Sequence, residues 1–310
     1  VAARDPNGFR PLVLGRLDGA WVVASETCAL DLIGGRIERY LDPGEVVVIR
    51  RGRLRSLRPF PKPERESFCI FEYIYFARPD SNLRGGSVYA FRKDLGRTLA
   101  REHPVEADMV VPLLDSGSPA ALGFAEESGI PFETAIIRNH FVGRTFIEPT
   151  QSIRDFGVKI KHNAVRGMLE GKRVALVDDS IVRGTTLLKI TGMIRNAGAR
   201  EVHVRISAPP TIGSCHYGID MPTRSELIAH RLSVDEIRER IGADSLGYLS
   251  LEGLRNVSLQ LKHGHCDACF STEYPVRIDS QHPAPQLSLF SSVGEQDGEE
   301  TELDERVPEA

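Results

Sequence analysis

The stretch Val174-Ala-Leu-Val-Asp-Asp-Ser-Ile-Val-Arg-Gly-Thr-Thr186 decides how the rest of this sequence is interpreted. Residues 174–177 are apolar and have the length of a buried strand in a parallel sheet. Asp178 and Asp179 follow at the carboxyl end of that strand, where open α/β sheets bind their ligands. From Ser180 onward the sequence supplies hydroxyl groups and a glycine, and then the start of a helix.

This loop has two chemically different halves. The first N–H groups of a helix have no partner within the helix, and the helix dipole favours negative charge, so the helix start near Thr185 suits a phosphate. The two carboxylates suit sugar hydroxyls or a divalent metal ion. An ordinary strand-to-helix turn is the plainer interpretation, but adjacent carboxylates followed by serine, glycine and two threonines favour a phosphorylated sugar.

Composition limits the possible classes of protein. A chain of 310 residues with 41% hydrophobic residues can bury one or two cores. A formal net charge of −4 gives no reason to expect nucleic-acid binding, and no apolar run is long enough to span a membrane. Five cysteines without a secretory signal indicate a reducing compartment, the cytoplasm, and metal or redox chemistry. A start at Val1 without methionine suggests a truncated or processed product.

The amino-terminal region is predicted to be antiparallel β-sheet. Residues 11–15 and 20–24 are short apolar runs separated by Asp18-Gly19, which is a hairpin signal. A further strand, Val46–Ile49, follows a turn at residues 42–45. The basic segment Arg50–Pro63 is expected to be an exposed connection.

From residue 64 onward, strands and helices alternate. Strand Met109–Leu114 runs into Asp115-Ser-Gly-Ser118 and then a helix from Ala120, which repeats the strand, polar loop and helix of the principal stretch. The other expected elements are a strand within Cys69–Ser81, helices at 88–102, 187–197, 225–230 and 234–241, and a strand at 201–207. The last helix has a capping box formed by Ser233 and Glu236.

Two further features suggest chemistry. Residues 136–161 form a basic, glycine-containing segment suited to closing over a polyphosphate, with Arg138, Arg144 and Lys161 as phosphate contacts; a solvated loop is the alternative. Cys266-Asp-Ala-Cys269 has the spacing that brings two thiolates to one metal, although the pattern alone fits a redox pair, half a zinc site or coincidence.

The principal stretch resembles the motif for 5-phosphoribosyl 1-pyrophosphate (PRPP) of the type I phosphoribosyltransferases. Its wording is similar to that of the glutamine PRPP amidotransferase family, and the resemblance extends over roughly residues 4–280. The resemblance implies a parallel sheet with flanking helices (64–280), preceded by an antiparallel remnant of an N-terminal nucleophile glutaminase domain (1–63). Residues 281–310 are polar and acidic and are expected to be a disordered tail.

The resemblance also implies site residues. The PRPP-binding set is Asp178, Asp179, Ser180, Arg183, Gly184, Thr185, Thr186, Asp115, Ser116, Gly117 and Lys161, in which the second loop holds pyrophosphate. Magnesium is expected at Ser116, Asp178 and Asp179. Many members bind a four-iron, four-sulfur cluster in contexts like those of Cys69, Cys215, Cys266 and Cys269, with zinc as the rival metal. Cys28 lies outside this set and is expected to be a buried small residue.

The reaction implied is displacement of pyrophosphate from PRPP by ammonia, giving 5-phosphoribosylamine, the first step of de novo purine synthesis. No cysteine is placed to be the glutaminase nucleophile, so this polypeptide is expected not to use glutamine, whereas the full-length enzyme obtains its ammonia from glutamine. A homotetramer inhibited by purine nucleotides is implied as well. Two alternatives are a non-catalytic PRPP-binding regulator and an inactive fragment.

Overall fold

The computed structural model describes residues 1–310 except 62, 64, 140–161, 262 and 278–310. Residues 1–275 belong to one compact unit, to which the following description applies. The predictions for Arg144, Lys161 and the acidic tail fall outside the described residues, and the domain boundary predicted at residue 63 stays a prediction. None of the helices within the described ranges combines the length and apolarity needed to cross a membrane.

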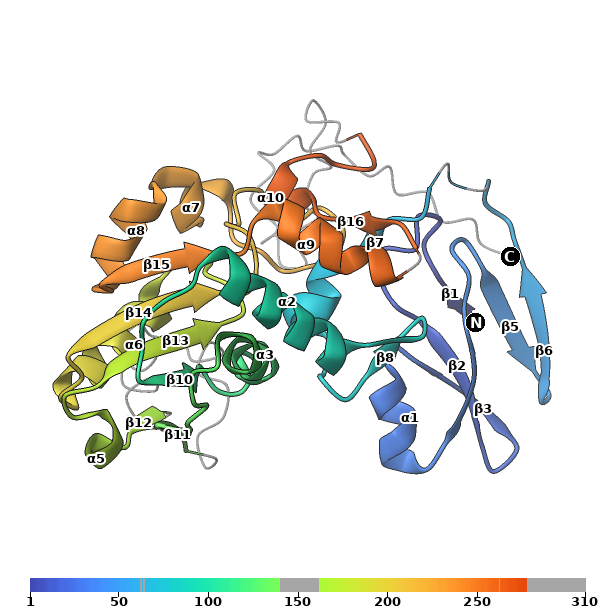
Figure 1. The fold of residues 1–310 in the computed structure, drawn as a ribbon. Helices are drawn as coiled ribbons and strands as arrows, with labels where there is room; N and C mark the ends of the chain where they lie inside the picture. The colour runs from blue at the N-terminus through green and yellow to red at the C-terminus, as the bar shows by residue number, and fades with distance from the viewer. Residues whose placement is uncertain (62, 64, 140–161, 262, 278–310) are drawn as a thin grey trace, which may run out of the picture. The chain divides into compact units, whose positions relative to one another are not determined.

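A four-stranded parallel sheet forms the centre of the fold (Figure 1). Its strands lie in the order β10 (Met109–Pro112), β13 (Arg173–Asp178), β14 (Glu201–Ile206) and β15 (Ser245–Tyr248). Every neighbouring pair is parallel, so all four carboxyl ends lie at the same edge of the sheet. The parallel sheet predicted from the sequence is confirmed.

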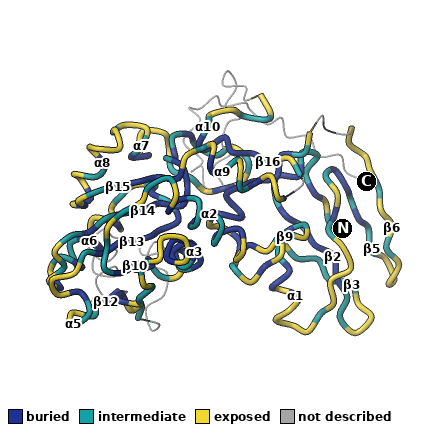
Figure 2. Tube along the Cα trace, viewed as in Figure 1, coloured by how far each residue is buried: buried dark blue, intermediate teal, exposed yellow. Residues whose placement is uncertain are grey.

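Two layers of helices cover the sheet, α2 (Val88–Glu102) and α3 (Ser118–Ser128) on one face and α6 (Thr185–Asn196) and α8 (Val234–Ile241) on the other (Figure 1). The alternation of side chains along a strand explains this arrangement. Residues 175 and 177 of β13 join the core under α2 and α3, and residues 174 and 176 join the core under α6 and α8. Burial on both faces is why the run is apolar throughout (Figure 2).

Close packing of α2 on α3 depends on glycine. A Cβ at Gly96 would overlap the backbone carbonyl of Ala120, and one at Gly123 would overlap that of Lys93. Gly96→Ala is therefore expected to lower the free energy of unfolding by about 2 kcal/mol through overpacking. The control is Gly192→Ala in α6, where nothing lies within 4 Å of the added atom. Urea unfolding checks the pair, and equal midpoints for both variants would contradict the packing argument.

The amino-terminal region is antiparallel, as predicted. One sheet has the order β1-β5-β6 and the other β3-β2-β4. Their members are β1 (Ala2–Ala3), β2 (Val13–Leu17), β3 (Ala20–Ala24), β4 (Arg36–Tyr40), β5 (Val46–Arg50) and β6 (Arg53–Leu57), with helix α1 (Thr27–Ile33). The prediction that residues 50–63 only connect was wrong, because β6 pairs with β5 across a turn at Arg51-Gly52. Its mostly exposed side chains gave no alternating apolar pattern.

The predicted strand within Cys69–Ser81 was also largely wrong. Strand β7 comprises only Phe68–Cys69, and the chain then turns into a π-helix, η1 (Glu72–Phe76). Residues 68–74 are buried on all sides, and a short run buried throughout has no periodicity that separates strand from helix. A single π-helical turn often marks a functional position.

Smaller elements complete the described chain. They are β8 (Asn82–Leu83), β9 (Gly86–Ser87), β11 (Ile136–Arg138), β12 (His162–Ala164), α5 (Arg166–Leu169), η3 (Arg224–Glu226), α7 (Ile228–Arg231), α9 (Leu251–Ser258), η4 (Leu259–Leu261), β16 (His265–Cys266) and α10 (Ala268–Ser271). The capping box of Ser233 and Glu236 at the start of α8 is confirmed.

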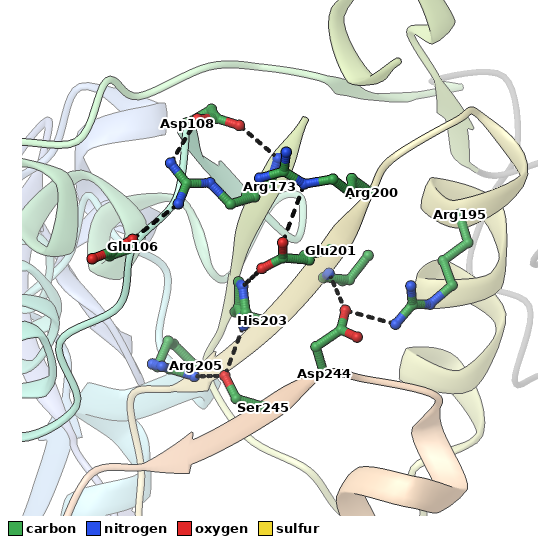
Figure 3. A network of polar contacts seen from close by, with 11 residues as sticks. Glu106, Asp108, Arg173, Arg195, Arg200, Glu201, His203, Arg205, Asp244 and Ser245 are labelled. Atoms are coloured by element: carbon green, nitrogen blue, oxygen red, sulfur yellow. Dashed lines mark hydrogen bonds and ion pairs between the residues drawn. The ribbon is translucent and has the colours of Figure 1, made fainter. Parts of the chain in front are cut away.

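A polar network holds the amino ends of the strands together (Figure 3). Asp244 accepts hydrogen bonds from the Val202 N–H (2.6 Å) and from Arg195 (2.7 Å). Ser245 contacts both His203 (3.0 Å) and Arg205 (2.9 Å). Asp244 precedes β15 and Ser245 begins it, whereas Arg205 is the fifth of the six residues of β14 and its side chain reaches back to Ser245. The network therefore joins β14 to β15 and to the last turn of α6.

Candidate functional site

The loop after β13 buries two adjacent carboxylates. Asp178 is 7% exposed and Asp179 is 4% exposed. The N–H of Asp179 donates to the Asp178 carboxylate (2.8 Å), and the Ser180 hydroxyl donates to Asp179 Oδ1 (2.6 Å). The predicted pair is therefore fixed in place at the carboxyl end of a central strand.

The environment of this pair favours a bound cation. Burial raises the pKa of Asp178, and the neighbouring charge of Asp179 raises it further. Burial also raises the pKa of Asp179, against hydrogen bonds from Ser116 and Ser180 that lower it. Two buried carboxylates side by side repel each other, and a divalent cation relieves that repulsion.

The second predicted loop lies against the first. The Leu113 N–H donates to the Val177 carbonyl (2.8 Å). A Cβ on Gly117 would lie 2.7 Å from the Val177 oxygen and 3.2 Å from Asp178 Cα, so only glycine permits this approach. Ser116 in this loop is among the groups that lower the pKa of Asp179 through hydrogen bonding. The structure thus brings together Ser116, Gly117 and the two aspartates, as the resemblance implied.

Basic side chains from the next hairpin reach the second loop. Arg138 at the end of β11 forms an ion pair with Asp115, and the peptide bond between Leu114 and Asp115 is cis. His162 at the start of β12 is buried, with Nε2 3.5 Å from the Leu114 carbonyl oxygen. Arg138 therefore lies next to residues 115–117, and its predicted contact with phosphate stays a prediction.

The start of α6 has the geometry expected of an anion site. Gly184 is its N-cap with φ of 77°, a left-handed conformation that favours glycine. Within the described residues no side chain caps this helix, and Thr185 and Thr186 are exposed. The first N–H groups and two hydroxyls are available to a phosphate. Arg183 is ion-paired with Glu226 (2.9 Å), so its predicted contact with PRPP stays a prediction.

Four of the five cysteines line one cavity. Cys69 and Cys266 are cross-strand partners in the short parallel pair β7–β16, and Cys215 and Cys269 complete the set. The enclosed space of this cavity is small, about 20 Å³. Burial raises the pKa of Cys69 to about 12 and that of Cys266 to about 11. These thiols therefore stay protonated until a metal displaces the protons.

The four cysteines of the cavity are the residues predicted to bind a metal. Among the described residues, no three His, Cys, Asp or Glu side chains lie close enough together to hold a single metal ion. Four thiolates around one space suit either an iron–sulfur cluster or tetrahedral zinc, so the choice between them stays a prediction. The fifth, Cys28, is buried elsewhere, and burial raises its pKa.

Comparison with known proteins gives a consistent result, although no protein-family model matches the chain. Amidophosphoribosyltransferase 2 of Arabidopsis thaliana, named as chloroplastic, is 55% identical over 280 residues. Those residues cover 89% of this chain and 49% of the plant protein. The chain is a homologue of the amidophosphoribosyltransferases.

Solved structures agree with this relationship. Glutamine PRPP amidotransferase from B. subtilis, complexed with ADP and GMP, matches with a TM-score of 0.82 and 50% identity. The match covers 92% of this chain and 63% of that chain. A structure described as the allosteric regulatory enzyme of purine biosynthesis matches with a TM-score of 0.81 and 52% identity, over 89% of this chain and 60% of that one. The chain thus spans about half to three fifths of the length of the amidophosphoribosyltransferases it matches.

Sequence reasoning about this amidophosphoribosyltransferase homologue missed two buried residues near the site, Arg92 and His162. Arg92 lies one turn from Val88 and from Leu95, within the apolar face of α2. A charge in an apolar face was the available signal, because an arginine is almost never fully buried without a partner. His162 borders the residues outside the described ranges, and nothing in its local sequence distinguishes it.

Proposed function

We propose that this chain carries the phosphoribosyltransferase activity of an amidophosphoribosyltransferase. The reaction is attack of ammonia on the anomeric carbon of PRPP, with pyrophosphate as the leaving group and 5-phosphoribosylamine as the product. This is the first step of de novo purine biosynthesis. The observation that carries the proposal is the meeting of three features at one edge of the sheet: the buried Asp178-Asp179 pair, the Ser116-Gly117 loop and the uncapped start of α6.

Different groups of residues bind different parts of PRPP. The backbone and hydroxyls of residues 180–186 hold the 5′-phosphate, and Asp178 and Asp179 hold the ribose hydroxyls. The loop 115–117 binds pyrophosphate. Ser116 and the two aspartates would hold magnesium, which neutralises charge on the leaving group. Arg138, Arg144 and Lys161 belong to the segment proposed to close over the substrate. The protein forms no covalent bond to the sugar, so catalysis consists of positioning and charge stabilisation.

The proposal includes a four-iron, four-sulfur cluster held by Cys69, Cys215, Cys266 and Cys269. Its support is that the four thiols line one cavity and that Cys69 and Cys266 are opposite each other in the pair β7–β16. The cluster joins β7 to β16 and so has a structural role. Thiols that bind metal must stay reduced, so the proposal includes a reducing compartment such as the cytoplasm.

Anaerobic release of pyrophosphate from PRPP with magnesium tests the activity. Ammonium is expected to support release by this polypeptide, and glutamine is not. Four of its cysteines line the cavity and Cys28 is buried with a raised pKa, so none is a ready nucleophile for glutamine. Failure with ammonium would refute the transferase proposal, and release with glutamine alone would refute the assignment of the cysteines.

Partners follow from the same proposal. The B. subtilis structure is named as a complex with ADP and GMP. We propose that purine nucleotides compete with PRPP in this chain too, since the α6 start and the adjacent carboxylates suit a 5′-phosphate and a ribose from either molecule. A homotetramer is part of the proposal, to be checked by sedimentation.

A further inference from the structure

The start of α7 contacts the loop that follows β13, although the two segments are far apart in the sequence. The Ile228 N–H donates to the Val182 carbonyl (2.9 Å). The Ile228 side chain is 6% exposed and belongs to the same core as Ile181. A Cβ on Gly184 would lie 2.8 Å from Ile228 Cδ1, so this side chain packs directly beside the N-cap of α6. Helix α7 therefore supports the loop through both its backbone and an apolar side chain.

An ion pair makes a second connection between the same two segments. Arg183 donates to Glu226 Oε1 from Nη2 (2.9 Å) and from Nε (3.3 Å). The other carboxylate oxygen, Oε2, accepts from the Thr223 N–H (3.1 Å) and hydroxyl (2.9 Å), in a capping box at the start of η3. Because the capping box already orients Glu226, less side-chain entropy is lost when Arg183 binds it than between two free side chains.

The loop held in this way is the part of the proposed site that binds the 5′-phosphate. Its donors are the first N–H groups of α6 and the hydroxyls of Thr185 and Thr186, whose directions depend on the backbone at Arg183 and Gly184. A loop already held in its binding conformation loses less freedom when the ligand arrives, and so binds it more tightly.

The loop predicted to hold pyrophosphate has a separate support. It follows β10, and the Leu113 N–H donates to the Val177 carbonyl (2.8 Å), which joins that loop to β13. Loss of the contact between Arg183 and Glu226 should therefore affect the 5′-phosphate end of PRPP and leave the pyrophosphate end unchanged.

We propose that Glu226 is a positioning residue for the 5′-phosphate of PRPP, which acts through Arg183, and that Ile228 supports the same loop. The ion pair fixes Arg183 and with it the backbone that leads into α6. The N–H groups at the start of α6 are thereby kept in the direction of the phosphate. This inference rests on the proposed function and adds a residue to which no contact with PRPP is assigned.

Glu236 is a matched control elsewhere in the chain. It forms the same kind of capping box, in which its Oε2 accepts from the Ser233 N–H (2.7 Å) and hydroxyl (2.8 Å) at the start of α8. Both glutamates are exposed. Replacement of either one removes one negative charge and one capping box, but of the two only Glu226 is bonded to Arg183.

The test compares Glu226→Ala, Glu226→Gln, Glu236→Ala and Glu236→Gln with the unchanged chain, all prepared anaerobically. Calorimetry measures the binding of PRPP, ribose 5-phosphate and pyrophosphate, each in the presence of magnesium. Pyrophosphate release with ammonium gives kcat and KM, and thermal unfolding reports stability.

Glu226→Ala is expected to weaken the binding of PRPP and of ribose 5-phosphate about fivefold, the upper end for an exposed ion pair. KM for PRPP should rise by a similar factor while kcat stays within about twofold, since the lost interaction acts equally on bound substrate and transition state. Glu226→Gln keeps a neutral acceptor for Arg183 and should weaken both ligands only about twofold. Pyrophosphate binding should not change in either variant. The two Glu236 variants should unfold at lower temperature and bind PRPP like the unchanged chain.

The outcomes separate the two proposals. An unchanged chain that does not bind PRPP overturns the proposed function together with this inference. If the unchanged chain binds PRPP and Glu226→Ala binds it equally well, the inference alone is overturned. The same holds if Glu226→Ala loses as much affinity for pyrophosphate as for ribose 5-phosphate, or if Glu236→Ala loses as much affinity for PRPP, because a general structural defect would cause either result. Should Glu226→Ala not fold, Glu226→Gln decides by the same comparisons.

Discussion

Asp178→Asn and Asp179→Asn are each expected to reduce ammonium-dependent release of pyrophosphate from PRPP by at least about 100-fold. Asparagine keeps the shape of the side chain but removes the charge that attracts magnesium and accepts hydrogen bonds from ribose hydroxyls. The two aspartates are buried next to each other, so water cannot replace the lost charge. The same loss should be seen in magnesium-dependent PRPP binding.

Asp244→Asn controls for damage to the sheet. Asp244 also binds a backbone N–H and a basic side chain, but at the amino ends of the strands (Figure 3). Its replacement should lower the unfolding temperature and leave kcat/KM within a few-fold. The Asp178→Asn and Asp179→Asn variants should instead lose turnover without losing stability. Burial raises the pKa of both carboxyl groups, so the fold tolerates a neutral side chain at either position. Turnover retained in both asparagine variants would remove the central argument for this site.

Cys266→Ser is expected to abolish iron binding. After both proteins are treated with iron and sulfide, the free energy of unfolding of the variant should be several kcal/mol lower than that of the unchanged chain. Cys266 lies opposite Cys69 in the pair β7–β16, where a bound group would join two segments distant in the sequence. Iron and sulfide content, visible absorption and thermal unfolding measure the effect under anaerobic conditions. Cys28→Ser, at a cysteine outside the cavity, should keep the full iron content. Iron retained by Cys266→Ser, or zinc in place of iron in the unchanged chain, would contradict the cluster.

The sequence predicted the central sheet and the two loops because their signals are local. An apolar strand followed by polar residues and a helix specifies where the strand ends and what lies there, as in residues 174–186 and again in 109–128. It failed where burial removes periodicity, as in residues 68–74, which are all buried and run from β7 into the first residues of η1. It also failed for β6, a strand at the edge of its sheet whose side chains are mostly exposed.

Parts of the candidate site depend on contacts that no local pattern contains. Arg92 of α2 donates to the carbonyls of Tyr73 and Ala77, which lie in η1 and at its C-cap, and no local pattern predicts these contacts. The cavity is lined by four cysteines, at positions 69, 215, 266 and 269. Their spacing in the sequence predicts proximity only for Cys266 and Cys269. Cys69 and Cys215 were predicted only from the resemblance to a family, and the structure places them in the same cavity.

The pair β7–β16 has a consequence for the order of folding. Each strand has two residues, too few to hold the pair together alone, yet the contact closes a loop that contains the whole parallel sheet. The entropy lost in closing so long a loop is recovered only once the intervening chain is compact. Cys69 and Cys266 therefore become neighbours late, after the sheet has formed. With the proposed cluster, iron uptake during refolding would report this final step, because the two thiols meet only after the sheet has formed.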